Sequence, residues 1–238
     1  MKKRHQHAVL TGDIIASTAL KGGELQSARK ALSNAAATLN DWYPSLIIGK
    51  LEFFGGDAWQ MLLADSSHAL RVAIYLRASL RSRKMADTRI SIGIGSIEKI
   101  VTKQISLSTG EAFTLSGRAL SKMTVYSDME IALPRALQPL NLWLGVVVSL
   151  CSTLLARWTP RQCEIICVAM RPDVSTQEEI GKRLRPRVRK QTVARALLSA
   201  GWRSVNDAIE AFEEVSWEPL IERSEKISLD SLRLLSGA

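Results

Sequence analysis

Cysteine is scarce in this chain and gives it no disulfide framework. The 238 residues include three cysteines, at positions 151, 163 and 167. An odd and sparse set of this kind is typical of a reducing compartment, so we expect a cytoplasmic protein. Cys163 and Cys167 lie four residues apart in an apolar helical stretch without further metal ligands nearby. This setting predicts buried packing rather than a metal site.

A long apolar run is also missing. The most apolar stretch, residues 142–155, has 14 residues, whereas a helix that spans a bilayer needs about 20. The apolar residues 8–10 are too few for a secretory signal. We therefore expect residues 142–155 to form a buried helix and expect no membrane partner, with a membrane-associated helix as the alternative.

Acidic residues are in the minority. The chain has 23 acidic and 32 basic residues and a formal net charge of +9. This excess predicts an anionic partner, such as nucleic acid, a nucleotide or an anionic membrane. Internal repeats and low-complexity tracts are absent from the sequence, and its length suits one large domain or two smaller ones.

The first 135 residues alternate between strand and helix patterns. A glycine pair, Gly55 and Gly56, separates two apolar runs as in a β-hairpin. The order strand, helix, strand, strand, helix, strand predicts an α+β fold, a ferredoxin-like sandwich with helices on one face of its sheet. The expected strands are 8–10, 46–54, 58–63 and 89–95, and the expected helices are 24–42, 66–80 and 111–125.

Helix signals dominate after residue 135. Thr159 is a good N-cap, and Pro160 suits the first position of a helix. The whole pattern predicts an all-α part that follows the sandwich. The expected division is a first domain at 1–135, a connecting apolar helix at 136–158, a helical domain at 159–215 and a helical tail at 216–238.

Two aspartates, each beside a glycine, border apolar strands. They are Asp13, after Gly12, and Asp57, after Gly56. A carboxylate among apolar residues is costly without a partner. Mg²⁺ is such a partner, because it takes one or two carboxylates and leaves its other positions to water and phosphate oxygens. Two such aspartates on neighbouring strands would present Mg²⁺ or Mn²⁺ to a nucleoside triphosphate. The alternative is that each aspartate only forms a turn.

Residues 175–201 follow the pattern of a helix-turn-helix. Ser175 and Glu178 form a capping box for a first helix, and Gly201 ends a second. Between positions 181 and 203 there are eight cations and no acid. This surface favours double-stranded DNA as a partner over a solvated basic face or a protein contact. The expected DNA contacts are Arg187, Arg189, Lys190, Gln191, Thr192 and Arg195, because Arg and Gln read base edges and cations meet phosphates.

A second basic stretch lies on and just after the expected helix 66–80. It consists of Arg71, Arg77, Arg81, Arg83 and Lys84. We interpret these cations as a solvated helix face, with a second nucleic-acid contact as the alternative.

The N-terminal part resembles the class III nucleotidyl cyclase homology domain. The motifs that carry the resemblance are Asp13–Thr18, Gly56–Asp57, Ile92–Gly95 and Phe113–Arg118. The resemblance implies that Asp13 and Asp57 bind two Mg²⁺ or Mn²⁺ ions and that Thr114 and Arg118 are the catalytic positions. It also implies that a nucleoside triphosphate lies on the backbone of Ile14, Ile15, Ala16, Ser17 and Thr18.

Two positions depart from the cyclase pattern. Thr114 stands where that family has an Asn, and Phe53 stands where purine cyclases have a base-reading Lys. The resemblance therefore implies the metal-binding part of a cyclase site without its purine-reading part.

The chain from about residue 6 to residue 215 is more similar still to SatD-like proteins. The shared motifs keep their order along the chain. They are Gly12–Ile15, Gly56–Gln60, Ile92–Gly95, Gly110–Phe113, Trp158–Gln162 and Gln177–Leu184. This resemblance implies a cyclase-like domain joined to a DNA-binding domain, a combination described as regulatory.

Three functions are consistent with these patterns. The first is a DNA-binding regulatory protein whose cyclase-like domain binds a nucleotide and a divalent metal as a sensor. The second is an active nucleotidyl cyclase of non-purine or unknown base preference, whose site would form in a homodimer. The third is a degenerate cyclase fold that serves only for dimerisation.

Overall fold

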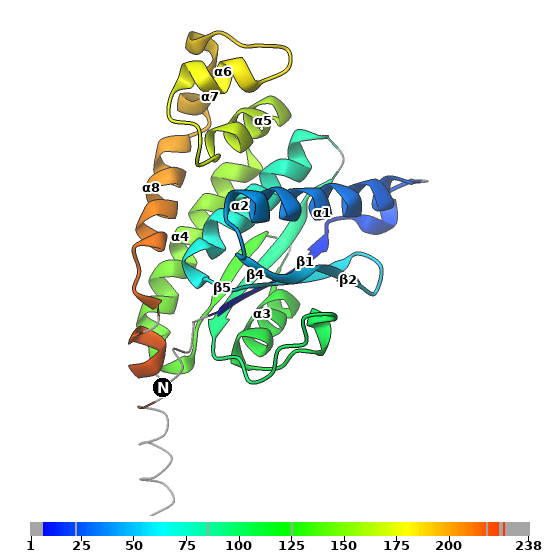
Figure 1. The fold of residues 1–238 in the computed structure, drawn as a ribbon, viewed down its shortest axis with the longest axis vertical. Coiled ribbons are helices and arrows are strands. Elements are labelled where there is room, and N and C mark those ends of the chain that lie inside the picture. The colour runs from blue at the N-terminus through cyan, green and yellow to red at the C-terminus, as the bar shows by residue number, and fades with distance from the viewer. Residues whose placement is uncertain are drawn as a thin grey trace, which may run out of the picture.

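The computed structural model shows a mixed α/β fold around a five-stranded sheet (Figure 1). It describes residues 7–223 except 22, 85, 125 and 218, together with residue 226. Most of the predicted tail, from residue 227 onward, and the basic residues 1–6 lie outside this described part. The strands are β1 (His7–Ile14), β2 (Ile47–Phe54), β3 (Ala58–Leu63), β4 (Thr88–Gly95) and β5 (Met129–Ala132).

The strand order is β2-β3-β1-β4-β5, with β1 at the centre. β1 pairs antiparallel with β3 and β4, and β4 pairs parallel with β5. The first four strands, with helices α1 (Glu24–Trp42) and α2 (Ala69–Ser82), form the predicted ferredoxin-like arrangement. The helix α3 (Glu111–Lys122) leads from β4 to β5, a short strand that the sequence pattern did not predict.

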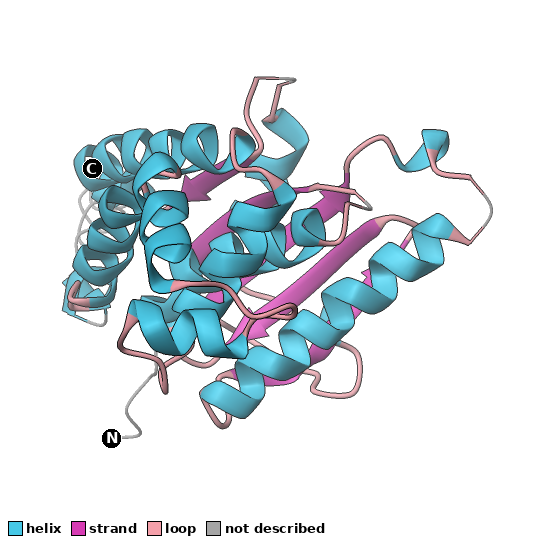
Figure 2. Cartoon of the chain, turned by 90° about the horizontal axis from the view of Figure 1, so that it is seen from above, coloured by secondary structure: helices cyan, strands magenta, loops and turns pink. Residues whose placement is uncertain are grey.

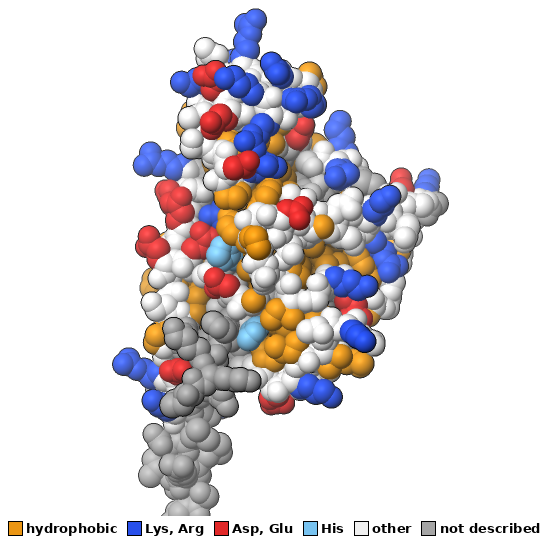
Figure 3. Space-filling model, viewed as in Figure 1, with side chains coloured by type: hydrophobic (Ala, Val, Ile, Leu, Met, Phe, Trp, Pro, Cys, Tyr) orange, Lys and Arg blue, Asp and Glu red, His pale blue; other side chains and the backbone are white. Residues whose placement is uncertain are grey.

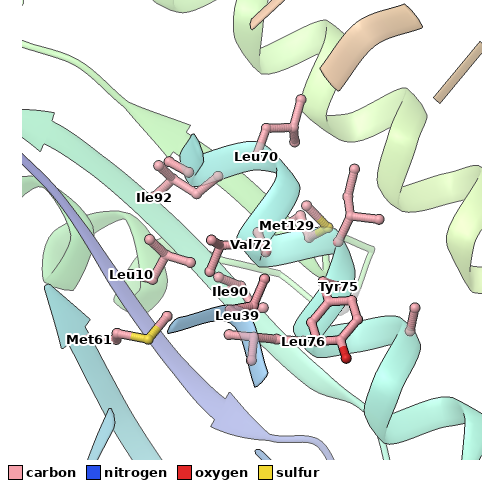
Figure 4. Close-up of a cluster of buried hydrophobic side chains, with 14 of the residues drawn as sticks. Leu10, Leu39, Met61, Leu70, Val72, Tyr75, Leu76, Ile90, Ile92 and Met129 are labelled. Atoms are coloured by element: carbon pink, nitrogen blue, oxygen red, sulfur yellow. The ribbon is translucent and has the colours of Figure 1, made fainter. Parts of the chain in front are cut away.

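Helices cover both faces of the sheet, with α1 and α2 on one side and α3 on the other (Figure 1), so the prediction that they cover one face was wrong. Figure 2 shows helices lying across the strands. Figure 4 shows strand side chains such as Leu10 and Met61 in one cluster with Leu39 of α1. On the other face, Val9 of β1 packs in a second cluster with Ala112 of α3. Adjacent strand residues point to opposite faces, so β1 is apolar on both sides and its sequence alone does not show which face carries helices.

The long apolar helix is α4 (Gln138–Ala156). The stretch Arg135–Ala156 has 22 residues, and its most apolar 18-residue window has a mean hydropathy of 1.7, with 28% of that window buried. By length and composition alone, this helix could cross a membrane. The apolar helix is therefore longer than the 14 residues that we estimated from the sequence. The prediction that this helix is buried holds for one of its faces only. That face packs into the core through Val148, Cys151 and Leu155. The other face carries an apolar stripe, defined by the exposed side chains of Leu142, Trp143, Val146 and Leu150.

The helices after α4 are α5 (Pro160–Ala169), α6 (Gln177–Arg183), α7 (Lys190–Ser199) and α8 (Trp202–Glu213). Thr159 caps α5 in a capping box, as predicted. The capping box of α6 is Thr176 with Glu179, one residue after the predicted pair. Both pairs have the required spacing of three, but Ser175 instead donates its backbone N–H to the Glu179 carboxylate at 3.0 Å.

The C-terminal helices pack on α2 and α4 (Figure 1). α5 lies against α2, and α8 lies against α4. The indole of Trp158 donates to the carbonyl of Ala200, just after α7, at 2.7 Å, and its ring meets Trp202 edge to face. The main apolar core thereby runs from the sheet into α8. The division into domains at residues 135 and 158 stays a prediction.

The three cysteines are free thiols, and Cys151 and Cys163 are buried. Burial raises the pKa of Cys151 to about 11 and raises the pKa of Cys167 further. Across the described residues, no group of three or more His, Cys, Asp or Glu side chains could hold a metal ion. The predicted burial is confirmed for Cys163, whereas Cys167 is partly buried and packs against the main core.

Candidate functional site

A pocket of about 380 Å³ opens where β1 ends, beside the turn between β2 and β3. It brings together the two predicted metal ligands and the predicted triphosphate loop, which come from separate parts of the sequence. The residues that line it are Asp13, Ile14, Ile15, Ala16, Ser17, Thr18, Asp57, Arg89, Thr124 and Asp128.

Strand pairing places Asp13 and Asp57 at this pocket. In the β1–β3 register Asp13 lies opposite Ala58, the residue after Asp57. The N–H of Ile14 donates to the carbonyl of Asp57 at 3.3 Å. The turn before Asp57 bends through two glycines with φ of 60° and 94°, conformations that favour glycine. The Gly-Gly-Asp sequence therefore bends the chain so that Asp57 reaches the end of β1.

The loop after β1 is held in an unusual conformation. Ala16 has φ of 53°, in the left-handed region that residues with a side chain seldom occupy. The N–H of Ile15 donates to the carbonyl of Asp87 at 2.9 Å, and the hydroxyl of Ser17 donates to the carboxylate of Asp57. A short 3₁₀ turn, Ser17–Ala19, starts here, and the first amides of such a turn have no partner within it. Backbone strain of this kind is common at binding sites.

Arg89 is the main residue of the pocket that sequence reasoning missed. It faces Asp13 across the β1–β4 pairing. Its Nε donates to Oδ1 of Asp13 at 2.9 Å, and its Nη2 donates to Oδ2 at 2.5 Å. These hydrogen bonds raise the pKa of Arg89 above its ordinary value. The pair of Asp13 and Arg89 follows from the register in which β1 and β4 align. The sequence pattern does not give that register.

Arg77, Arg81, Asp87, Asp128 and Ser152 form a polar network beside the pocket, the Arg77 network. The side chain of Arg77 has no exposed surface. It donates to Asp87 at 2.6 and 3.0 Å, to Asp128 at 2.9 Å and to Ser152 of α4 at 2.9 Å. Arg81 donates to Asp87 at 2.8 Å. A buried cation is tolerated when it is paired and hydrogen-bonded in this way.

The prediction of a solvated basic face at Arg71, Arg77 and Arg81 was therefore wrong. Arg71 makes a two-pronged ion pair with Glu213 of α8, at 2.5 and 2.8 Å. The helix pattern showed where the three cations lie, but it did not show their acidic partners. Asp87, which binds Arg77 and Arg81, follows the helix closely, whereas Asp128 and Glu213 come from distant parts of the chain. Asp128, which lines the pocket and joins the Arg77 network, was not singled out from the sequence for the same reason.

The donor set of the pocket suits a hard cation. Asp13, Asp57 and the Ser17 hydroxyl offer oxygen atoms only. Mg²⁺ needs one or two carboxylates and keeps several waters, so the two aspartates suffice without a larger cluster. Arg89, which holds both oxygens of Asp13, would have to move for a cation to bind there.

The single chain does not bring Thr114 and Arg118 to this pocket. Both lie on α3, outside the pocket lining. The hydroxyl of Thr114 donates to the carbonyl of Gly110 at 3.3 Å. Their catalytic assignment stays a prediction.

The candidate DNA interface lies on α7 and the segment before it. Ile165, Ile180, Leu184 and Val193 form the apolar cluster that joins α5, α6 and α7. Figure 3 shows Lys and Arg side chains gathered at the end of the molecule that carries α6 and α7. All six predicted DNA contacts are exposed: Arg187, Arg189, Lys190, Gln191, Thr192 and Arg195.

The cations of α6 and α7 differ in their pairing. On α6, Lys182 pairs with Glu178 at 2.7 Å and Arg183 pairs with Asp173 at 2.8 Å. Hydrogen bonds from arginines, Arg183 among them, lower the pKa of Asp173 to about 2. Within the described residues, none of the cations among the predicted contacts of α7 forms an ion pair. The predicted contact residues are thus exposed, and Glu178 of α6 lies near enough to Lys190 to interact with it electrostatically.

Comparisons with known proteins identify no family. No protein-family profile and no curated protein match the chain. Among the solved structures that match, the crystal structure of the guanylyl cyclase Cya2 aligns at 16% sequence identity and a TM-score of 0.38, over 56% of this chain and 77% of that chain. The SatD-like and cyclase-like resemblances stay predictions that rest on the motifs.

Proposed function

We propose that this chain is a DNA-binding regulatory protein whose cyclase-like N-terminal part binds a nucleoside triphosphate with Mg²⁺ or Mn²⁺ as a sensor. One observation carries the proposal. The pocket at the end of β1 gathers the Asp13–Thr18 motif and Asp57, the residues that the cyclase resemblance assigns to metal and triphosphate. This convergence distinguishes the proposal from two unrelated turn aspartates.

In the proposed complex Asp13 and Asp57 hold the divalent cation, and the loop Ile14–Thr18 holds the phosphates through its backbone. The cation would neutralise the phosphate charge and orient the chain of phosphates. The Ser17 hydroxyl already contacts Asp57 and so positions that carboxylate.

The DNA-binding part of the proposal rests on α7. Its exposed cations form no ion pair among the described residues, although Lys190 lies near Glu178 of α6, so they can meet phosphates and base edges. Residues 184–189 separate α6 from α7, a longer link than the tightest helix-turn-helix has.

A continuous set of polar contacts supports coupling between the two sites. Asp128 lines the pocket and accepts from Arg77, which also donates to Ser152 of α4. Arg81 donates to the carbonyls of Ala156 and Trp158 at 2.9 and 3.2 Å. The Trp158 indole in turn holds the end of α7. Ligand binding would change DNA affinity by the difference in its affinity for the two arrangements of this network.

DNA retention tests this proposal. The change of Arg189→Ala with Arg195→Ala should weaken binding of the full chain to duplex DNA and reduce the slope of log affinity against log salt by up to about 2. Lys30→Ala is the control, because Lys30 is an exposed cation on α1, outside the basic interval 181–203. Unchanged retention in the double variant would refute DNA binding through α7.

The same assay, with Mg²⁺ and each nucleoside triphosphate added in turn, tests the sensor. One of them should change the DNA affinity of the unaltered chain and leave that of Asp57→Asn unchanged. If none changes DNA affinity, the regulatory coupling is wrong.

A second candidate is the active nucleotidyl cyclase. The position of Thr114 and Arg118 on α3, outside the pocket, favours it, because a second copy could bring these residues to the pocket of the first. Release of pyrophosphate from any nucleoside triphosphate with Mn²⁺, lost in Asp13→Ala and in Arg118→Ala, would favour the enzyme. Activity that survives in Arg118→Ala would remove that residue from the site.

A further inference from the structure

Arg89 stands on the opposite side of Asp13 from Asp57. β1 lies between β3 and β4, so Asp57 approaches Asp13 from the β3 side and Arg89 from the β4 side. Among the described residues that line the pocket, Arg89 is the one cationic side chain, against three acids. Its side chain is 35% exposed and that of Asp13 is 21% exposed. Asp13 is therefore already bound by a cation of the protein itself.

A divalent cation and Arg89 would compete for the same carboxylate. Mg²⁺ or Mn²⁺ would take at least one oxygen of Asp13, and its charge would repel the guanidinium at short range. The planar fork of an arginine fits phosphate oxygens as well as it fits a carboxylate. A polyphosphate that arrives with the cation therefore offers Arg89 a new partner inside the same pocket.

We infer that Arg89 is a phosphate-binding residue of this pocket that also blocks Asp13 against metal ions that arrive without a polyphosphate. When the metal–triphosphate binds, Asp13 exchanges Arg89 for the cation, and Arg89 exchanges Asp13 for a phosphate. The pocket thereby discriminates between a free cation and a cation bound to triphosphate. This inference rests on the proposed nucleotide and metal site. It adds that Arg89 makes this site select a cation bound to triphosphate over a free cation.

The variant Arg89→Gln tests the exchange, because two probes should respond in opposite directions. Binding of Mn²⁺ alone to the full chain, measured by equilibrium dialysis, should tighten about tenfold, since no guanidinium has to be displaced. Binding of inorganic triphosphate with Mg²⁺ should weaken about tenfold, which corresponds to about 1.4 kcal/mol. If Arg89 only supported the fold, its replacement would weaken the binding of both probes.

Two further variants complete the experiment. Arg89→Lys keeps the charge without the fork, so its affinity for each probe should fall between those of the unaltered chain and Arg89→Gln. Arg203→Gln removes an exposed cation on α8 and should change neither affinity. If Arg89→Gln does not fold, the same opposite changes in affinity for Mn²⁺ alone and for triphosphate with Mg²⁺ are expected in Arg89→Lys.

Unchanged or weaker Mn²⁺ binding in the Arg89 variants overturns the inference, even if the unaltered chain binds nucleotide. Tighter Mn²⁺ binding supports the inference, even if no nucleotide changes DNA affinity. The failure of the exchange and the failure of the regulatory proposal are thus distinguishable.

Discussion

Single glycines determine how closely α3 can approach the sheet. A Cβ on Gly93 of β4 would lie 2.3 Å from the carbonyl oxygen of Ala112 and 2.6 Å from the amide nitrogen of Ser116. Both contacts are with the backbone of α3, which cannot give way as a flexible side chain can. A Cβ on Gly145 of α4 would meet nothing within 4 Å.

Two alanine substitutions should therefore have opposite effects on stability. Gly93→Ala should lower the free energy of unfolding by about 1–3 kcal/mol, because α3 must move away from β4. Gly145→Ala should raise it by about 0.5–1 kcal/mol, because alanine restricts the unfolded chain and fits the helix. Urea denaturation followed by circular dichroism measures both. A stabilising Gly93→Ala would contradict the close packing.

At the residue scale, the sequence predicted what lies within one motif and missed what depends on strand register. Asp13, the loop after it and Asp57 were all predicted at one site. Arg89 was not predicted there, because the alternating pattern of a strand does not show which residue of the next strand lies opposite. The same reason explains Asp128, which reaches the pocket only through the pairing of β5 with β4.

At the scale of elements, α4 has two apolar faces with different surroundings. Leu155 has no exposed surface and packs in the main core, whereas Trp143, on the apolar stripe, is 74% exposed. The helix pattern predicted burial because a helix that is apolar all round is usually buried. A uniform pattern cannot show which face meets the core.

Substitutions on the two faces of α4 should differ clearly in their effect on the free energy of unfolding. Leu155→Ala should cost about 2–5 kcal/mol of unfolding free energy, because it leaves a cavity in the core. Trp143→Ser should cost at most about 0.5 kcal/mol in the isolated chain. Thermal and urea denaturation check the difference. A Trp143→Ser cost as large as that of Leu155→Ala would mean that the stripe is covered.

At the scale of the whole molecule, one buried cation connects the sheet to the C-terminal helices. Arg77 binds Asp87 and Asp128 at the pocket and Ser152 on α4, and Trp158 extends the connection to the end of α7. The sequence predicted the order of the first four strands and of the helices along the chain, without β5. It did not predict this connection, because Arg77, which we interpreted as a solvated cation, is buried and pairs with Asp128 from a distant segment.

The central claim is that Asp13 and Asp57 together hold a cation for a nucleoside triphosphate. Denaturation of the full chain with Mg²⁺ and each nucleoside triphosphate in turn tests it most directly. At a hundredfold excess over Kd, the bound nucleotide should raise the free energy of unfolding by about 2.7 kcal/mol, and both Asp13→Asn and Asp57→Asn should lose this gain. A chain that no nucleotide stabilises, or a gain that persists in both variants, would contradict the account.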